Sequence, residues 1–137
     1  INYHIDNNFL GEGTPKEKVA KNIEAIKILK KLEQENKLAN KDEQEVLAQY
    51  VGWGGLPDVF DEKKSNWSEE YNILKQLLTK EEYESARAST LTAFYTPPVV
   101  IRNIYKALQN MGLKQANILE PSCRCRKFYR NATRRIR

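Results

Sequence analysis

Three helix-capping patterns of one kind divide the first ninety residues of this chain. In each, a Thr or Asn precedes a Glu by three positions: Thr14 and Glu17, Asn40 and Glu43, Thr79 and Glu82. In such a capping box the first side chain accepts the N–H of the Glu, whose carboxylate accepts the N–H of the cap. The patterns therefore predict a helix from residue 15 to about residue 37, a shorter one after residue 40, and one from residue 80 to about residue 88.

Apolar residues recur at helical spacing behind these starts. Val19, Ile23, Ile26 and Leu29 form one stripe on the first predicted helix. A further helix is predicted by four large side chains between the second and third boxes: Trp67, Tyr71, Leu74 and Leu78. Spacings of three and four place such residues on one face, so each helix has a side to bury.

A fifth helix is predicted after Thr96-Pro97-Pro98, because proline suits the first helical position. Four apolar residues at helical spacing predict its inner face: Ile101, Ile104, Leu108 and Met111. Gly112 is its expected stop. Residues 117–120, Asn-Ile-Leu-Glu, then read as a short strand.

The segment 50–57, Tyr-Val-Gly-Trp-Gly-Gly-Leu-Pro, predicts an ordered loop. Its three glycines permit positive φ and close backbone approach. For Trp53 a buried position under this loop is favoured over a platform for stacking on nucleic-acid bases.

The fold class that follows is mainly α: a small bundle of about five helices, then a single short strand opening an incomplete α/β domain. We expect an irregular arm at 1–14, a helical region at 15–92, and the start of an α/β unit at 93–123. The last expected segment of the chain is a basic tail at 124–137.

Charge is placed unevenly along the 137 residues, whose net formal charge is +5. The tail holds seven cations and no acid: Arg124, Arg126, Lys127, Arg130, Arg134, Arg135 and Arg137. Residues 1–123 then carry 16 basic and 18 acidic side chains, a net of −2. The basic character therefore belongs to the tail.

Two stretches resemble the adenine-specific DNA methyltransferases, particularly type I modification subunits. Residues 94–98 read Phe-Tyr-Thr-Pro-Pro, and residues 118–123 read Ile-Leu-Glu-Pro-Ser-Cys. Segments 50–57 and 86–91 are also similar to the N-terminal region of large methylase–helicase fusions of bacterial conjugative elements and phages. The resemblance covers roughly residues 6–123.

This resemblance implies S-adenosylmethionine as cofactor and DNA as partner in the parent family. By it, Tyr95, Thr96 and Pro97 would lie near the methionine part of the cofactor. Glu120, Pro121 and Cys123 would lead into the glycine loop that holds it. No catalytic residue is assigned, because the family's Asn/Asp-Pro-Pro-Tyr/Phe tetrapeptide does not occur in the sequence.

The sequence departs from the family at that loop. Where the family has Gly-x-Gly-Asn-Phe, residues 124–128 read Arg-Cys-Arg-Lys-Phe. One hypothesis is a one-base shift of reading frame after Cys123: suitable codons for Gly-Val-Gly-Asn-Phe-Ile-Gly-Met-Leu-Pro-Glu-Glu-Phe, read after one inserted base, translate into the observed tail. Because those codons are chosen to fit, the gene sequence is the test. The expectation is a truncated, inactive fragment that binds no cofactor.

Two alternatives stay open. The tail, with Phe128 and Tyr129 among its cations, would suit a small nucleic-acid-binding module. The unpaired edge of an incomplete sheet would favour self-association. The lysines of the first helix are interspersed with Glu and read as a solvated face rather than a phosphate track.

Other features exclude function classes. No apolar run is long enough to span a membrane, and no signal peptide is visible, so no membrane partner is expected. Cys123 and Cys125 suit neither a disulfide nor a zinc site, and His4 has no partner in view, so no metal is expected. A reducing cytoplasmic location is the default.

Overall fold

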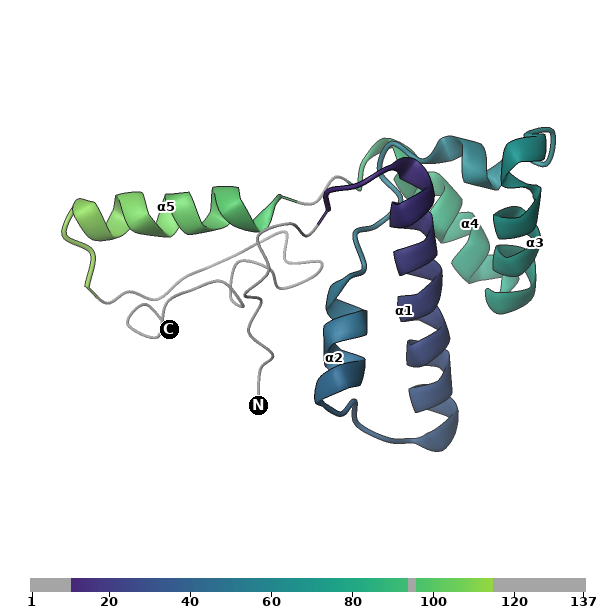
Figure 1. Ribbon diagram of the computed structural model, residues 1–137, viewed down its shortest axis with the longest axis horizontal. Coiled ribbons are helices and arrows are strands. Elements are labelled where there is room, and N and C mark those ends of the chain that lie inside the picture. The colour runs from purple at the N-terminus through teal and green to yellow at the C-terminus, as the bar shows by residue number, and fades with distance from the viewer. Residues whose placement is uncertain (1–10, 94–95, 115–137) are drawn as a thin grey trace. The chain divides into compact units, whose positions relative to one another are not determined.

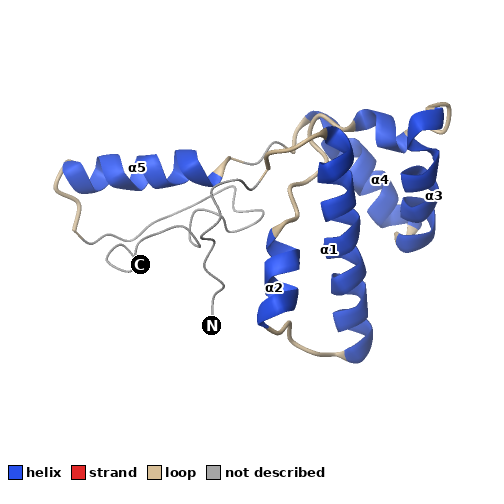
Figure 2. Ribbon diagram, in the orientation of Figure 1, coloured by secondary structure: helices blue, strands red, loops and turns tan. Residues whose placement is uncertain are grey.

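The computed structural model describes residues 11–93 and 96–114. These residues are mainly helical and include no strand (Figures 1 and 2). The helices are α1 (Pro15–Glu35), α2 (Lys41–Ala48), α3 (Ser68–Leu77), α4 (Lys80–Ala88) and α5 (Pro98–Asn110). Short 3₁₀ turns lie at η1 (Pro57–Phe60), η2 (Ser65–Trp67) and η3 (Ser89–Leu91). The mainly α prediction is confirmed, whereas the predicted strand lies outside the described residues.

All three predicted capping boxes are present. The Thr14 N–H donates to Glu17 at 2.7 Å, and the Glu17 N–H donates back to the Thr14 hydroxyl at 3.3 Å. The same reciprocal pairs start α2 at Asn40 and α4 at Thr79. Helix α1 ends two residues before the predicted point, because Asn36 adopts a left-handed conformation with φ of 48°.

The chain divides into two compact units, whose boundaries fall between residues 10 and 11 and between residues 95 and 96. Residues 11–93 belong to the larger unit, which contains α1 to α4. In it α2 returns alongside α1, while α3 contacts both α1 and α4 (Figure 1).

The core of this unit gathers around the loop that follows α2. Its buried side chains come from α1, the loop, η1, η2, α3 and α4: Val19, Ile23, Trp53, Leu56, Val59, Phe60, Trp67, Leu74 and Tyr83. Rings meet edge to face within it, with centroids 5.2 Å apart for Trp53 and Phe60 and 5.4 Å for Phe60 and Tyr83. Such packing of large rings makes the aromatic cluster the main apolar support of the unit.

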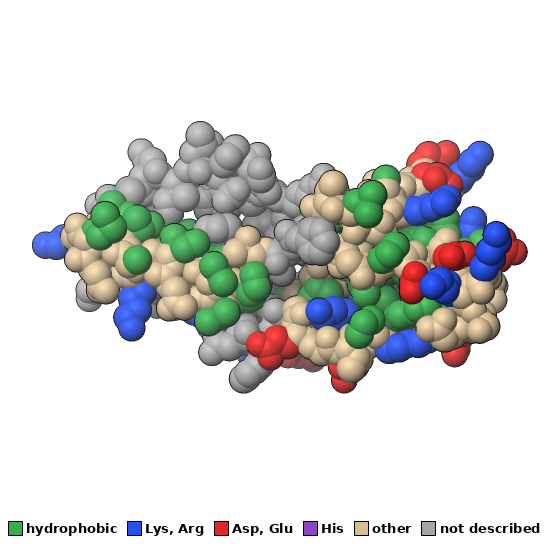
Figure 3. All heavy atoms as spheres, turned by 90° about the horizontal axis from the view of Figure 1, so that it is seen from above, with side chains coloured by type: hydrophobic (Ala, Val, Ile, Leu, Met, Phe, Trp, Pro, Cys, Tyr) green, Lys and Arg blue, Asp and Glu red, His purple; other side chains and the backbone are tan. Residues whose placement is uncertain are grey.

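Helix α5 corrects one expectation about its inner face. Ile101 is fully buried as predicted, but Ile104 is 41% exposed and Met111 is 84% exposed. Tyr105 is buried instead, together with Pro98. Figure 3 shows hydrophobic side chains exposed on α5, so only part of its apolar face is buried.

Candidate functional site

The start of α5 is the part of the predicted cofactor site that the structure describes. Thr96 and Pro97 are exposed, and Pro97 is the N-cap in extended conformation. No side chain caps this helix start. The Val100 and Ile101 N–H groups bond to the Pro97 carbonyl at 3.1 and 3.3 Å, which leaves Val99 as the first residue to offer an N–H outward.

The other predicted cofactor residues lie outside the described part of the chain. These are Tyr95, Glu120, Pro121 and Cys123, and the basic tail 124–137 lies there as well. The structure therefore brings none of them to Thr96 and Pro97, and their roles remain predictions.

The glycine loop is held from two directions. The Asn22 amide of α1 donates to the Gly52 carbonyl at 2.7 Å and accepts the Val51 N–H at 2.9 Å. From the other side, the Gly55 N–H donates to the Thr90 carbonyl at 3.0 Å. Gly52 and Gly55 have φ of 78° and 74°, a region that side chains with a Cβ rarely adopt.

Trp53 is buried by this loop, with 2% of its surface exposed. Its ring contacts Phe60 and Tyr50 rather than solvent. The favoured interpretation, a buried Trp rather than a base-stacking platform, is confirmed.

Two of the lysines on α1 form ion pairs with carboxylates of other helices. Lys16 Nζ contacts Glu70 at 2.7 Å and lies 4.4 Å from the centre of the Trp67 ring. Lys30 pairs with Glu82, and this pairing lowers the pKa of the Glu82 carboxyl, with the Thr79 N–H adding to the effect. Carboxylates thus occupy two of these lysines.

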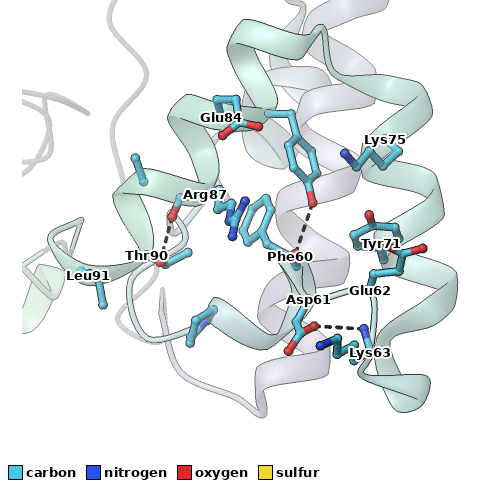
Figure 4. A pocket seen from close by; sticks show the side chains of 13 residues that line it. Phe60, Asp61, Glu62, Lys63, Tyr71, Lys75, Glu84, Arg87, Thr90 and Leu91 are labelled. Atoms are coloured by element: carbon cyan, nitrogen blue, oxygen red, sulfur yellow. Dashed lines mark hydrogen bonds between the residues drawn. The ribbon is translucent and has the colours of Figure 1, made fainter.

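Sequence reasoning missed an open cleft of about 810 Å³ in the larger unit. Its walls come from η1 and the following loop, α3, α4 and η3 (Figure 4). Aromatic residues at its floor are Phe60 and Tyr83, and the Tyr83 hydroxyl donates to the Phe60 carbonyl at 3.3 Å. Burial, and then the nearby Tyr71, raise the pKa of Tyr83 to about 12, so this phenol stays neutral at physiological pH.

Two cations face this cleft from neighbouring helices. Lys75 of α3 lies with its Nζ 4.0 Å from the centre of the Tyr83 ring and 5.7 Å from that of Tyr71. Arg87 of α4 lies on the other side of the cleft, near Phe60 (Figure 4). The ion pairs formed among the described residues include neither Lys75 nor Arg87. The sequence contained one signal for this arrangement. Tyr71 and Lys75, and likewise Tyr83 and Arg87, are four residues apart and so share a helix face.

Acidic residues also line the cleft. The Asp61 carboxylate accepts a hydrogen bond from the Lys63 backbone N–H at 2.9 Å. This bond holds the carboxylate against the loop that contains it. Glu62 and Glu84 are exposed at the rim. The cleft is therefore of mixed charge, with Lys75 and Arg87 beside its aromatic floor.

The described residues include neither a metal-binding cluster nor a membrane-spanning helix. His, Cys, Asp and Glu side chains form no group of three that could hold a metal ion there. Within the same ranges, every helix is too short or too polar to cross a membrane.

Comparisons with known proteins give no relative for this chain. No protein-family model, curated protein or solved structure matches it.

Proposed function

We propose that this chain carries the helical N-terminal region and the opening of the cofactor domain of an S-adenosylmethionine-dependent, adenine-specific DNA methyltransferase of a bacterial mobile element. The chain itself transfers no methyl group. In this proposal the protein works in the cytoplasm, where cofactor and DNA are both present.

The observation that carries the proposal is the start of α5. Helix α5 begins at Pro98, directly after Thr96-Pro97, and one of the two boundaries between the compact units falls just before Thr96. The resemblance requires a new domain and a new helix at this point. An uncapped helix start also suits a carboxylate such as that of the cofactor's methionine part, because the Val99 N–H and the helix dipole favour negative charge.

The residues after Cys123 do not fit the cofactor. Arg124 and Arg126 stand where the family has glycines, and each adds a Cβ and a cation beside a ligand whose sulfonium is itself positive. We therefore derive no methyl-transfer step for this chain and place no catalytic residue in it.

The gene sequence after codon 123 tests the parentage. We expect an adjacent reading frame to encode Gly-x-Gly-Asn-Phe from that point. Codons that restore no glycine loop in either other frame contradict the frame-shift explanation.

Calorimetric titration of the full chain with S-adenosylmethionine tests its inactivity. We expect no saturable heat, and the same result for a variant with Thr96→Ala. Micromolar affinity in the unaltered chain contradicts the proposal that it binds no cofactor.

A second candidate function rests on the composition of the tail. Seven cations and no acid in residues 124–137, with Phe128 and Tyr129, are suited to phosphates and bases. The test is DNA binding at 50 and 200 mM salt, with a chain ending at Cys123 as the comparison. Binding that falls with salt and vanishes with the tail supports this function, and salt-independent binding contradicts it.

Self-association through a sheet edge is a further proposal of the same kind. Light-scattering mass of the full chain tests it, and a monomeric mass of about 16.0 kDa contradicts it.

A further inference from the structure

The cleft between α3 and α4 has the composition of a binding site rather than of a packing defect. Its volume of about 810 Å³ lies in the range of small-molecule sites, roughly 300–1,000 Å³. It lies wholly within the larger unit, so its argument is independent of the cofactor domain and of the proposed function.

Its cations are placed where they are available to a ligand. Lys75 and Arg87 project from different helices toward the same floor, and ion pairs among the described residues occupy neither (Figure 4). By contrast, Lys16 and Lys30, on the neighbouring helix α1, pair with Glu70 and Glu82. Cations left without a carboxylate beside apolar rings are an electrostatic attraction for an anion.

The floor adds apolar surface without negative charge, and the single proton of the Tyr83 hydroxyl is already donated to the Phe60 carbonyl. Tyr83 stays protonated at physiological pH, because burial raises the pKa of its phenol to about 12. Tyr71 is only half-buried, so part of its ring and its hydroxyl can reach a ligand. A planar ring system can pack on such an aromatic face.

The carboxylates of the cleft limit which anions fit. Glu62 and Glu84 at the rim repel an extended chain of negative charges that runs along it. A compact anion needs only the space beside Lys75 and Arg87, so it meets less of this negative charge than an extended one. Phosphate suits this position, because its several oxygens accept from a planar guanidinium, an ammonium and a hydroxyl together.

We propose that the cleft binds a nucleotide phosphate, held between Lys75 and Arg87, with the attached base or sugar against Tyr71. The phosphate is that of a free mononucleotide, or a single phosphate of a single-stranded nucleic acid whose neighbouring phosphates stay clear of Glu62 and Glu84.

The test is a two-dimensional amide NMR titration of the full chain, which separates the cleft from the basic tail by residue. Adenosine 5′-monophosphate and a ten-residue oligothymidylate are the two ligand arms, and adenosine without phosphate is the reference. We expect saturable shifts in residues 61–63, 75 and 84–91 with at least one phosphate ligand, and none with adenosine. The arm with the tighter binding identifies the source of the phosphate.

Matched variants test the residues. Lys75→Ala with Arg87→Ala should weaken binding at the cleft at least about tenfold, because two charge-assisted contacts are lost. Lys27→Ala with Lys80→Ala removes the same net charge from exposed positions outside the cleft and should change binding less than about twofold. Tyr71→Phe gives a milder variant that keeps the ring if the double variant unfolds, and it should weaken binding about threefold.

Several results overturn the proposal. These are shifts confined to residues 124–137, equal shifts with adenosine and its monophosphate, and full affinity in a folded Lys75→Ala, Arg87→Ala variant. Saturation of the cleft by hexaglutamate at lower concentration than by either nucleotide ligand also overturns it, in favour of an acidic peptide.

Discussion

Asn22 on α1 and Gly52 in the following loop are joined by a buried hydrogen bond of 2.7 Å across 30 residues of sequence. The same amide accepts the Val51 N–H, and the Asn22 side chain is fully buried. One polar side chain thus satisfies two backbone groups of a loop that has no regular partner.

Replacing Asn22 with Ala should destabilise the larger unit by about 2–4 kcal/mol, because it leaves two backbone groups without their partner. Urea denaturation followed by tryptophan fluorescence measures this change. Asn72→Ala, at an exposed position on α3, is the matched control and should stay within about 0.5 kcal/mol. Equal effects of the two substitutions would show that the amide contacts contribute nothing.

Gly55→Ala should cost about 1–2 kcal/mol, because a Cβ is unfavourable at a φ of 74°. Gly54, its neighbour in the same loop, is not among the glycines with positive φ. Gly54→Ala should therefore cost less. Thermal denaturation of the two variants compares them, and a larger loss for Gly54→Ala would argue against the observed loop conformation.

Stability should fall as the pH drops below about 4.5, partly through Glu82. The hydrogen bond from Lys30, followed by that from the Thr79 N–H, lowers the pKa of this carboxyl in the folded state from 4.5. A lowered folded pKa gives stability that is present above the unfolded value and lost as the pH falls through the folded one.

Glu82→Gln should accordingly flatten the dependence of stability on pH between about 5 and 3. Chemical denaturation at several pH values gives the slope. Repeating it in 0.5 M salt should reduce the part due to Lys30, because an exposed ion pair is screened. An unchanged slope in the variant would contradict a role for Glu82.

Two isoleucines on α5 allow a comparison within one helix. Ile101 is fully buried and Ile104 is 41% exposed. Ile101→Ala should cost about 2–5 kcal/mol, whereas Ile104→Ala should cost less than about 1 kcal/mol. Amide hydrogen exchange of residues 98–110 measures both, and similar costs for the two variants would support the inner face predicted from sequence.

The elements that sequence predicted well depend on nearby residues. The reciprocal bonds at Thr14, Asn40 and Thr79 join positions three apart, so the pattern contains the whole interaction. The burial of Trp53 was also predictable, because glycines beside a large apolar ring favour a tight loop over it.

Local sequence patterns could not predict which face of α5 is buried, nor could they predict the cleft. Val99 and Val100 are exposed while Tyr105 is buried, an outcome that depends on what packs against the helix and not on its own spacing. The cleft needs Phe60, Tyr71 and Arg87 together, and only the fold decides that these meet. The predicted residues beyond Lys114 lie outside the described part of the chain.

The loop between α2 and η1 has a consequence for the order in which the larger unit folds. Its contacts join Gly52 backward to Asn22 and Gly55 forward to Thr90, so both require closure of long chain segments. Local helical turns form much faster than such closures. We therefore expect the loop to close after the helices around it have formed, so that the burial of Trp53 marks the end of folding.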